Sequence, residues 1–294
     1  MIFLTNDVAF SKSLSKALPG RVFRQISLSD CSPDVAKRFV ITHLDSDPDP
    51  APAGYGGADG QAAKLTPSQR RPDLAELDEC ISYLGGRLTD LEFLARRIKT
   101  GETPSKAVRE IIEQSAAEIL RLYLFNADGS PQRRWTPEQA WLLVRGLAAA
   151  DTLRYNELLL ADAFKAGAGA GGGEPVLQAL EQAELIAIVS AHGRPHAVRP
   201  GKPVYQAAFR LLTGDRVLRS RLDLAVLALQ IKLANADVDK WETELRLIGE
   251  LPRQPPELAA RTRYLLGKLQ AAQDKVDGWE RESAALKKVL SSEY

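Results

Sequence analysis

The sequence has few cysteines and no excess of either charge. The two cysteines, Cys31 and Cys80, stand outside any CxxC or Cys/His spacing, which excludes a disulfide framework and favours structural thiols. The 39 basic residues are balanced by 38 acidic ones, for a net charge of +1. Such a balance produces no overall field that would attract nucleic acid or an anionic membrane, so any contact of that kind must come from a local patch.

Long apolar runs are missing as well. No stretch reaches the roughly 18 consecutive apolar residues that a membrane-spanning helix needs. Residues 1–14 (MIFLTNDVAFSKSL) have neither the basic region nor the cleavage site of a signal peptide. They open instead on the short apolar run 2–5, which predicts a buried strand. A domain that begins on a buried strand is expected to be a piece of a longer protein.

Motifs for catalysis or phosphate binding are also absent from the sequence. No GxxxxGK[ST] loop occurs, and the Gly-rich run 166–174 has no following Lys-Ser/Thr, so a flexible linker is its better interpretation. No histidine lies near a nucleophile signature. His192 and His196 are four residues apart in a predicted hairpin, but no carboxylate or cysteine pattern joins them, which does not favour a metal site.

The patterns that are present predict a mostly α-helical chain with a partial α/β piece. Residues 1–44 predict the end of an α/β domain, with strands over 2–5 and 22–28 and helices over 8–18 and 33–44. Two strands are too few for a stable sheet, so the others are expected upstream. Residues 45–72 are rich in Pro, Gly and Asp and predict a disordered insertion.

Three further units are expected after the insertion. Residues 73–124 predict a helical lid, with helices over 73–84, 88–99 and 104–123. Residues 125–214 predict a winged-helix-like module, with helices over 137–147, 155–165, 175–184 and 203–213 and a hairpin turning at His192-Gly193. Residues 215–294 predict an antiparallel, coiled-coil-like helical hairpin with a weak spot at 235–240. Its second arm has an apolar seam of Leu265, Leu269, Ala272, Val276, Trp279, Ser283, Leu286 and Leu290.

Two pairs of residues in the α/β piece are candidates for sensing a nucleotide. Thr5 and Asn6 follow a buried strand, where open α/β sheets place ligand-contacting groups, although a turn that caps the next helix explains them equally well. Arg21 and Arg24 flank the second strand, where an arginine could reach a neighbouring subunit's nucleotide. Ordinary charge at a strand edge is the commoner reason for such arginines.

Arg87 is a further candidate. It stands behind Gly85-Gly86 at the mouth of a helix, in the stretch LGGRLTDLEFLARRIKTG, where it could reach an anionic ligand such as a phosphate. Judged from spacing alone, a surface or ion-paired arginine after a helix start is the commoner outcome.

The predicted wing is basic and could touch a nucleic-acid backbone. Its basic residues are His192, Arg194, His196, Arg199 and Lys202. The helix before it carries Glu174, Glu181 and Glu184 and no basic residue, so phosphates would be repelled where such modules normally read DNA. Protein–protein packing is therefore the favoured role of this module.

Several long motifs resemble the C-terminal half of the mitochondrial escape protein 2 family. They are FLTNDVAFSKSLSKALPGRVFRQISLSD, LDECISYLGGRLTDLEFLARRIKTGETPSKAVREII, RWTPEQAW, LRYNELLL, VLQALEQAELIAIV, RPGKPVYQAAFRLL and LRLIGELP. The resemblance covers nearly the whole chain except 45–72 and 166–173. It implies that Thr5 and Asn6 match the sensor strand of an AAA-like core, that Arg21 or Arg24 occupies a finger-like region, and that Arg87 matches the second-sensor arginine of the lid.

The same resemblance implies a place and a role in the cell. Members are fungal mitochondrial inner-membrane proteins with one span, an RNA-recognition module in the matrix and an AAA-like domain in the intermembrane space. The family is associated with mitochondrial genome maintenance, DNA escape from mitochondria, nucleoid structure and number, and RNA processing. We would then expect self-association or inner-membrane protein partners for this chain, and nucleic acid bound through the RNA-recognition module upstream.

The chain departs from that family pattern in what it lacks. The phosphate loop, the Mg²⁺-binding acidic strand, the membrane span and the RNA-recognition module are all absent from these 294 residues. Phosphoryl transfer needs the backbone cradle and the metal, so we expect no catalysis and no cofactor here, and ATP only in a longer protein. Three readings stay open: a non-catalytic assembly and lever module, the nucleotide-sensing half of an ATPase, and a nucleic-acid-binding wing.

Overall fold

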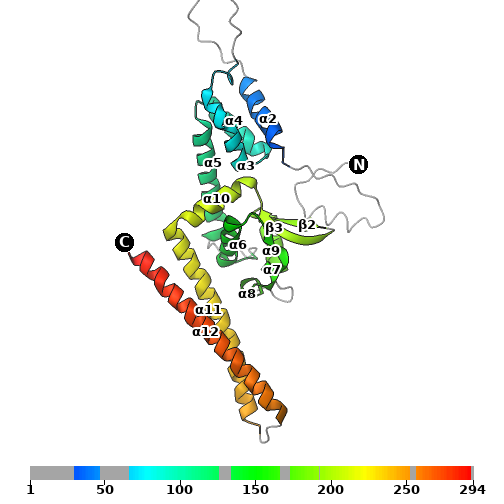
Figure 1. The fold of residues 1–294 in the computed structure, drawn as a ribbon, viewed down its shortest axis with the longest axis vertical. Coiled ribbons are helices and arrows are strands. Elements are labelled where there is room, and N and C mark those ends of the chain that lie inside the picture. Colours follow the sequence, from blue (N-terminus) through cyan, green and yellow to red (C-terminus); the bar gives the residue numbers. More distant parts are fainter. Residues whose placement is uncertain are drawn as a thin grey trace, which may run out of the picture.

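A computed structural model describes residues 30–46, 66–125, 134–165, 173–191, 193–251 and 256–292. These residues are mostly helical, with one small antiparallel sheet, as the composition and periodicity predict (Figure 1). The predicted strands 2–5 and 22–28, the helix 8–18, most of the insertion 45–72 and most of the Gly-rich linker lie outside the described residues.

The lid forms at one end of the molecule (Figure 1). Its elements are the 3₁₀ turn η1 (Pro72–Glu76), α3 (Leu77–Leu84), α4 (Leu88–Lys99), α5 (Pro104–Ile119) and the π turn η2 (Leu120–Leu124). We include in this unit α2 (Pro33–Asp45), which was predicted with the α/β piece and which packs on α3 and α4. The predicted helix over 73–84 therefore begins as a 3₁₀ turn, and the one over 104–123 ends as a π turn. In α4 the residues Leu91, Leu94, Ala95 and Ile98 are buried at helical spacing, which directs one apolar face onto α2 and α5.

Arg71 fastens the start of the lid to the end of α4. Its guanidinium donates to the backbone carbonyl of Ile98 and, at 2.6 Å, to that of Glu102. It also pairs with Asp73 at 2.7 Å and holds the pKa of that carboxyl below its usual value. Arg71 thus ties the segment before η1 to one carbonyl at the end of α4 and to one just after it; the Ile98 carbonyl also accepts from the Gly101 amide at 3.0 Å.

The second unit, which we call the middle module, consists of residues 134–214. Its elements are α6 (Pro137–Ala149), β1 (Leu153–Arg154), α7 (Tyr155–Leu160), α8 (Asp162–Lys165), α9 (Glu174–Gln182), β2 (Ile186–Ala191), β3 (Arg194–Pro200) and α10 (Pro203–Gly214). A capping box starts α6: Thr136 accepts from the Gln139 amide at 3.3 Å, and Gln139 accepts from the Thr136 amide at 2.9 Å.

The sheet of the middle module has the order β1-β3-β2, and all its pairs are antiparallel. The predicted hairpin is confirmed, whereas β1 was not predicted because two residues are too short to show a period. The helix predicted over 155–165 is wrong as one element, since the chain leaves the helix at Ala161 and forms α7 and α8 separately. The element order agrees with a winged helix, and that fold name stays a prediction.

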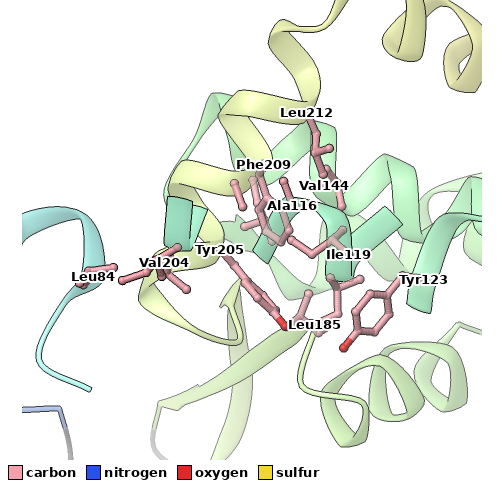
Figure 2. Close-up of a cluster of buried hydrophobic side chains, with 14 of the residues drawn as sticks. Leu84, Ala116, Ile119, Tyr123, Val144, Leu185, Val204, Tyr205, Phe209 and Leu212 are labelled. Atoms are coloured by element: carbon pink, nitrogen blue, oxygen red, sulfur yellow. The ribbon is translucent and has the colours of Figure 1, made fainter. Parts of the chain in front are cut away.

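One hydrophobic core runs from the lid through α10 into the middle module. Figure 2 shows Val204 beside Leu84 at the end of α3, and Tyr205 and Phe209 among Ile119, Val144 and Leu185. Helix α10 packs on α3 and α5 on the lid side and on α6 on the other side. The lid and the middle module therefore share a core rather than meeting at a wet interface.

The helical hairpin projects from the opposite side of the molecule (Figure 1). It consists of α11 (Arg216–Gly249) and α12 (Pro256–Ser292), and the two helices pack along their length. The predicted seam of α12 is confirmed: Leu265, Ala272 and Val276 are buried and its other members are half-buried. The weak spot predicted at 235–240 is uninterrupted helix. Arg261 joins the arms through two bonds to Glu244, at 2.7 and 2.9 Å.

A buried carboxylate fixes the root of the hairpin to the middle module. Asp223 of α11 is 6% exposed and accepts from the indole nitrogen of Trp141 at 2.8 Å and from Arg145 at 3.0 Å, both on α6. Arg219 approaches the other carboxylate oxygen at 3.4 Å. Because Trp141 is fully buried, its N–H has no access to water as an alternative acceptor.

We expect Asp223→Ala to lower the free energy of unfolding by about 1–3 kcal/mol, because it strands the buried Trp141 donor. Asp237→Ala is the matched control, since Asp237 pairs only with Lys240 on the exposed surface of the same helix. Urea unfolding of both variants measures the difference, and equal effects would contradict the anchoring role of Asp223.

Candidate functional site

Of the residues proposed to sense a nucleotide, the structure describes Arg87. Thr5, Asn6, Arg21 and Arg24 lie outside the described residues, so their roles stay predictions. Arg87 is the N-cap residue of α4, with an extended backbone, and its side chain is 35% exposed. Its guanidinium lies 3.8 Å from the carboxylate of Glu184, which follows α9 in the middle module. The predicted position at the mouth of a lid helix is confirmed, and the partner is a carboxylate of the same chain.

The two glycines before Arg87 allow neighbouring segments to approach closely. A Cβ on Gly86 would lie 1.9 Å from the carbonyl oxygen of Cys31, whose amide donates to the Gly86 carbonyl at 2.9 Å. Gly85 has a φ of +67°, and a Cβ there would lie 2.5 Å from the Cβ of Pro203. The Gly-Gly pair thus serves backbone packing and a left-handed turn, which only glycine provides without strain.

A third glycine closes the same junction from the middle module. A Cβ on Gly201 would lie 1.9 Å from the carbonyl oxygen of Glu184, and the Gly201 amide donates to the Leu185 carbonyl at 3.0 Å. We call this meeting point the Arg87 junction and define it as Cys31, Gly85–Arg87, Asp90, Glu184–Leu185 and Gly201–Pro203. It joins the lid to the middle module next to the N-terminus of α10.

The charges at the Arg87 junction are mixed. Lys202, whose side chain is 20% exposed, lies 4.0 Å from Glu184 and 3.8 Å from Glu118 of α5. Asp90 in the first turn of α4 has a buried carboxylate oxygen without a hydrogen-bond partner among the described residues. Burial raises the pKa of Asp90, and the nearby Arg87 and Lys202 act in the opposite direction. Three carboxylates therefore surround two cations, which is a poor arrangement for attracting a further anion.

Two buried tyrosines lie beneath this charged layer. The Tyr123 hydroxyl, on the π turn after α5, donates to the backbone carbonyl of Ala183, one residue before Glu184. Figure 2 shows the Tyr205 hydroxyl of α10 turned toward that of Tyr123. Burial raises the pKa of both phenols, so both stay protonated at physiological pH. Tyr123 thus attaches the residue that follows α9 to the π turn of the lid.

The sequence could not identify the partner of Arg87. Glu184 lies far along the chain, and we interpreted it as part of an acidic recognition helix together with Glu174 and Glu181. That interpretation is wrong for Glu184, because α9 ends at Gln182. Glu174 and Glu181 do lie on the helix, and Glu181 accepts a hydrogen bond from the backbone amide of Ile188 at 3.2 Å. The one available signal was an acidic residue at a helix C-terminus, where the helix dipole disfavours it.

The wing is less basic than its sequence suggests. Arg194, His196 and Arg199 of β3 are exposed. Lys202 is engaged with Glu118 and Glu184, and its ammonium lies 5.0 Å from the centre of the Tyr205 ring. His192 lies outside the described residues.

Comparisons with known proteins agree over most of the chain. A family model described as RNA12 protein matches residues 1–251. The chain is 61% identical over 297 aligned residues to "Mitochondrial escape protein 2" of Phaeosphaeria nodorum, covering 100% of this chain and 35% of that protein. Proteins of the same name from Chaetomium globosum and Aspergillus niger are each 50% identical, again over 100% of this chain and over 35% and 34% of their own lengths.

The chain thus spans about a third of the length of the curated relatives it matches. No solved structure matches it. In the part of the chain that the structure describes, no helix has the length and apolar character needed to cross a membrane.

We expect Gly86→Ala to destabilise the fold by about 1–3 kcal/mol, because the new methyl group would overlap the Cys31 backbone. Gly278→Ala in α12 is the control: a Cβ there meets no atom within 4 Å, and helix propensity should stabilise it by about 0.5–1 kcal/mol. Denaturant unfolding reports both, and a shift of the same sign in both variants would argue against close approach as the reason for Gly86.

Proposed function

Because the chain belongs to the RNA12 protein family, we propose that it is the non-catalytic assembly and lever part of a mitochondrial inner-membrane protein that maintains the mitochondrial genome. The name that its relatives share, mitochondrial escape protein 2, supports the mitochondrial assignment. We place this part in the intermembrane space, and we propose that the whole protein limits DNA escape and controls nucleoid structure and number.

The observation that carries the lever proposal is the continuous path from the lid to the hairpin. Helix α10 shares its core with α3 and α5, and Asp215 then both ends α10 and caps α11 by accepting from the Leu218 amide at 3.0 Å. At the root of α11, Asp223 ties the hairpin to α6. If the lid moved relative to the middle module, the direction of the 34-residue helix α11 would therefore change as well.

The far part of the hairpin has the exposed apolar side chains that a partner contact needs. They are Leu247 and Leu251 on or just after α11, and Tyr264 and Leu266 on α12. Exposed leucines occur singly on most proteins, but four large apolar side chains within one hairpin end favour association. We propose that this end mediates self-association or binds inner-membrane proteins.

A second candidate function is nucleotide sensing, which the position of Arg87 at the lid junction favours. In this alternative, upstream residues complete an ATPase and Arg87 responds to its nucleotide. Nucleotide binding by the full-length protein that is lost on Arg87→Ala would support it. Full-length protein that binds no nucleotide would exclude it.

Nucleic-acid contact by the wing is a third candidate, which the exposed Arg194 and Arg199 favour. It would connect this chain to RNA processing. Phosphate contacts weaken steeply with salt, so DNA and RNA binding should be compared at low and physiological salt for the chain and for an Arg194→Ala/Arg199→Ala variant. Negligible affinity at low salt would rule the wing contact out.

For self-association, we expect Leu247→Ser and Leu266→Ser each to raise the dissociation constant about tenfold, because each removes a leucine from the proposed contact. Leu160→Ser is the matched control, since Leu160 is 69% exposed but lies on α7, away from the hairpin. Sedimentation over a range of concentrations measures all three. A wild-type chain that stays monomeric throughout would remove self-association as the role of the hairpin.

A further inference from the structure

Glu184 has a backbone conformation that is unusual for its residue type. Its φ is +62°, and within the described ranges it is the sole residue other than glycine with a positive φ. Its amide donates to the Glu181 carbonyl at 3.0 Å, and the Leu185 amide donates to the Leu180 carbonyl at 3.1 Å. These two bonds form a Schellman motif at the end of α9, with Glu184 at the position that glycine usually occupies.

Neither the backbone nor the helix favours glutamate at this position. An L-residue in the left-handed region is strained because its Cβ approaches the following carbonyl, and glycine avoids that strain. A carboxylate at a helix C-terminus also faces the negative end of the helix dipole. The motif alone would therefore be more stable with glycine at position 184. The side chain of Glu184 must make contacts that offset this cost.

The side chain of Glu184 contacts two cations from two other segments. One carboxylate oxygen lies 3.8 Å from Arg87, in the turn between α3 and α4, and 4.0 Å from Lys202, the N-cap residue of α10. The left-handed turn is what directs the chain into β2 while its carbonyl packs against Gly201. Glu184 is thus the residue at which the lid, the end of α9 and the start of α10 are joined by charge.

We infer that Glu184 is a latch residue: its carboxylate holds Arg87 and Lys202 together and so fastens the lid to the middle module at the start of α10. The strained backbone is the conformation that places this carboxylate between the two cations. The Glu184 side chain is 52% exposed and the pairs lie at 3.8–4.0 Å, so the latch is weak, screened by salt and able to open.

The latch also gives a way in which a ligand would change the orientation of the proposed lever, and this consequence rests on the proposed function. Arg87 is ion-paired with Glu184, so a phosphate group that reached Arg87 would have to displace that carboxylate. If Glu184 also left Lys202, the ion pair with Glu118 would remain at the N-terminus of α10, with Asp90 nearby. Replacing one anion by another at Arg87 would then change the ion pairs at the N-terminus of α10, the helix that leads into the hairpin.

Three variants separate the charge of Glu184 from its backbone. Glu184→Gln keeps the strain and removes the charge, whereas Glu184→Gly removes both. Glu157→Gln is the control, because Glu157 pairs with Arg154 on the exposed surface of the same module, at 3.1 Å. Hydrogen exchange in segments 84–90 and 199–206 reports opening of the junction, and thermal unfolding reports global stability.

At low salt, we expect both Glu184 variants to exchange about two- to fivefold faster than wild type in these two segments. Glu184→Gly should nevertheless melt about 2–4 °C above Glu184→Gln, because glycine relieves the strain. High salt should remove the difference between wild type and Glu184→Gln, and in an Arg87→Ala/Lys202→Ala background Glu184→Gln should have no further effect. Glu157→Gln should change neither segment.

The latch would be overturned if Glu184→Gln exchanged at the wild-type rate in both segments at low salt. It would also be overturned if Glu184→Gln changed the exchange rates equally with and without Arg87 and Lys202. These measurements are made without nucleotide and without a partner protein. If they give the expected result while the full-length protein binds no nucleotide, the latch stands and nucleotide sensing falls. If nucleotide binding is found and the exchange rates are unchanged, the latch falls and sensing stands.

Discussion

The burial of α10 on both of its sides is the constraint on which the rest of the structure depends. Val204, Tyr205, Ala208, Phe209 and Leu212 are buried on this helix, while Arg210, Leu211 and Gly214 face solvent. Their neighbours come from α3 and α5 on one side and from α6 on the other. Because one helix supplies the core to both units, the lid and the middle module cannot separate without exposing apolar surface. Any motion between them is limited to small shifts at the charged rim.

That rim is the Arg87 junction, and it combines features that seldom occur together. Gly86 and Gly201 bring backbones into direct contact, and Gly85 lies against the side chain of Pro203. The ion pairs of Glu184 with Arg87 and Lys202 lie at the same place. The buried part is rigid because there is no room for a Cβ, and the charged part is adjustable because its pairs are long and half-exposed. A close-packed pivot with a weak charged clasp supports the lever role that we propose.

Sequence reasoning located the elements well and their partners poorly. Arg87 illustrates both: its place at the start of α4 follows from the Gly-Gly turn and the apolar period of the helix, which are local properties. Its partner, Glu184, belongs to another unit and stands where local rules would put glycine. The strand β1 was missed for the same reason, since pairing with β3 stabilises two residues that have no pattern of their own.

The sequence by itself determined most of the helices and the hairpin seam, because each depends on spacings within one stretch of chain. It also determined the family, because long motifs survive in their order. Only the tertiary structure decided what the glycines and charges are for. Position 86 has no room for a Cβ because the Cys31 backbone packs against it. Arg87 pairs with the carboxylate of Glu184 because α9 ends beside it. Such contacts join residues distant in the chain, and no local period records them.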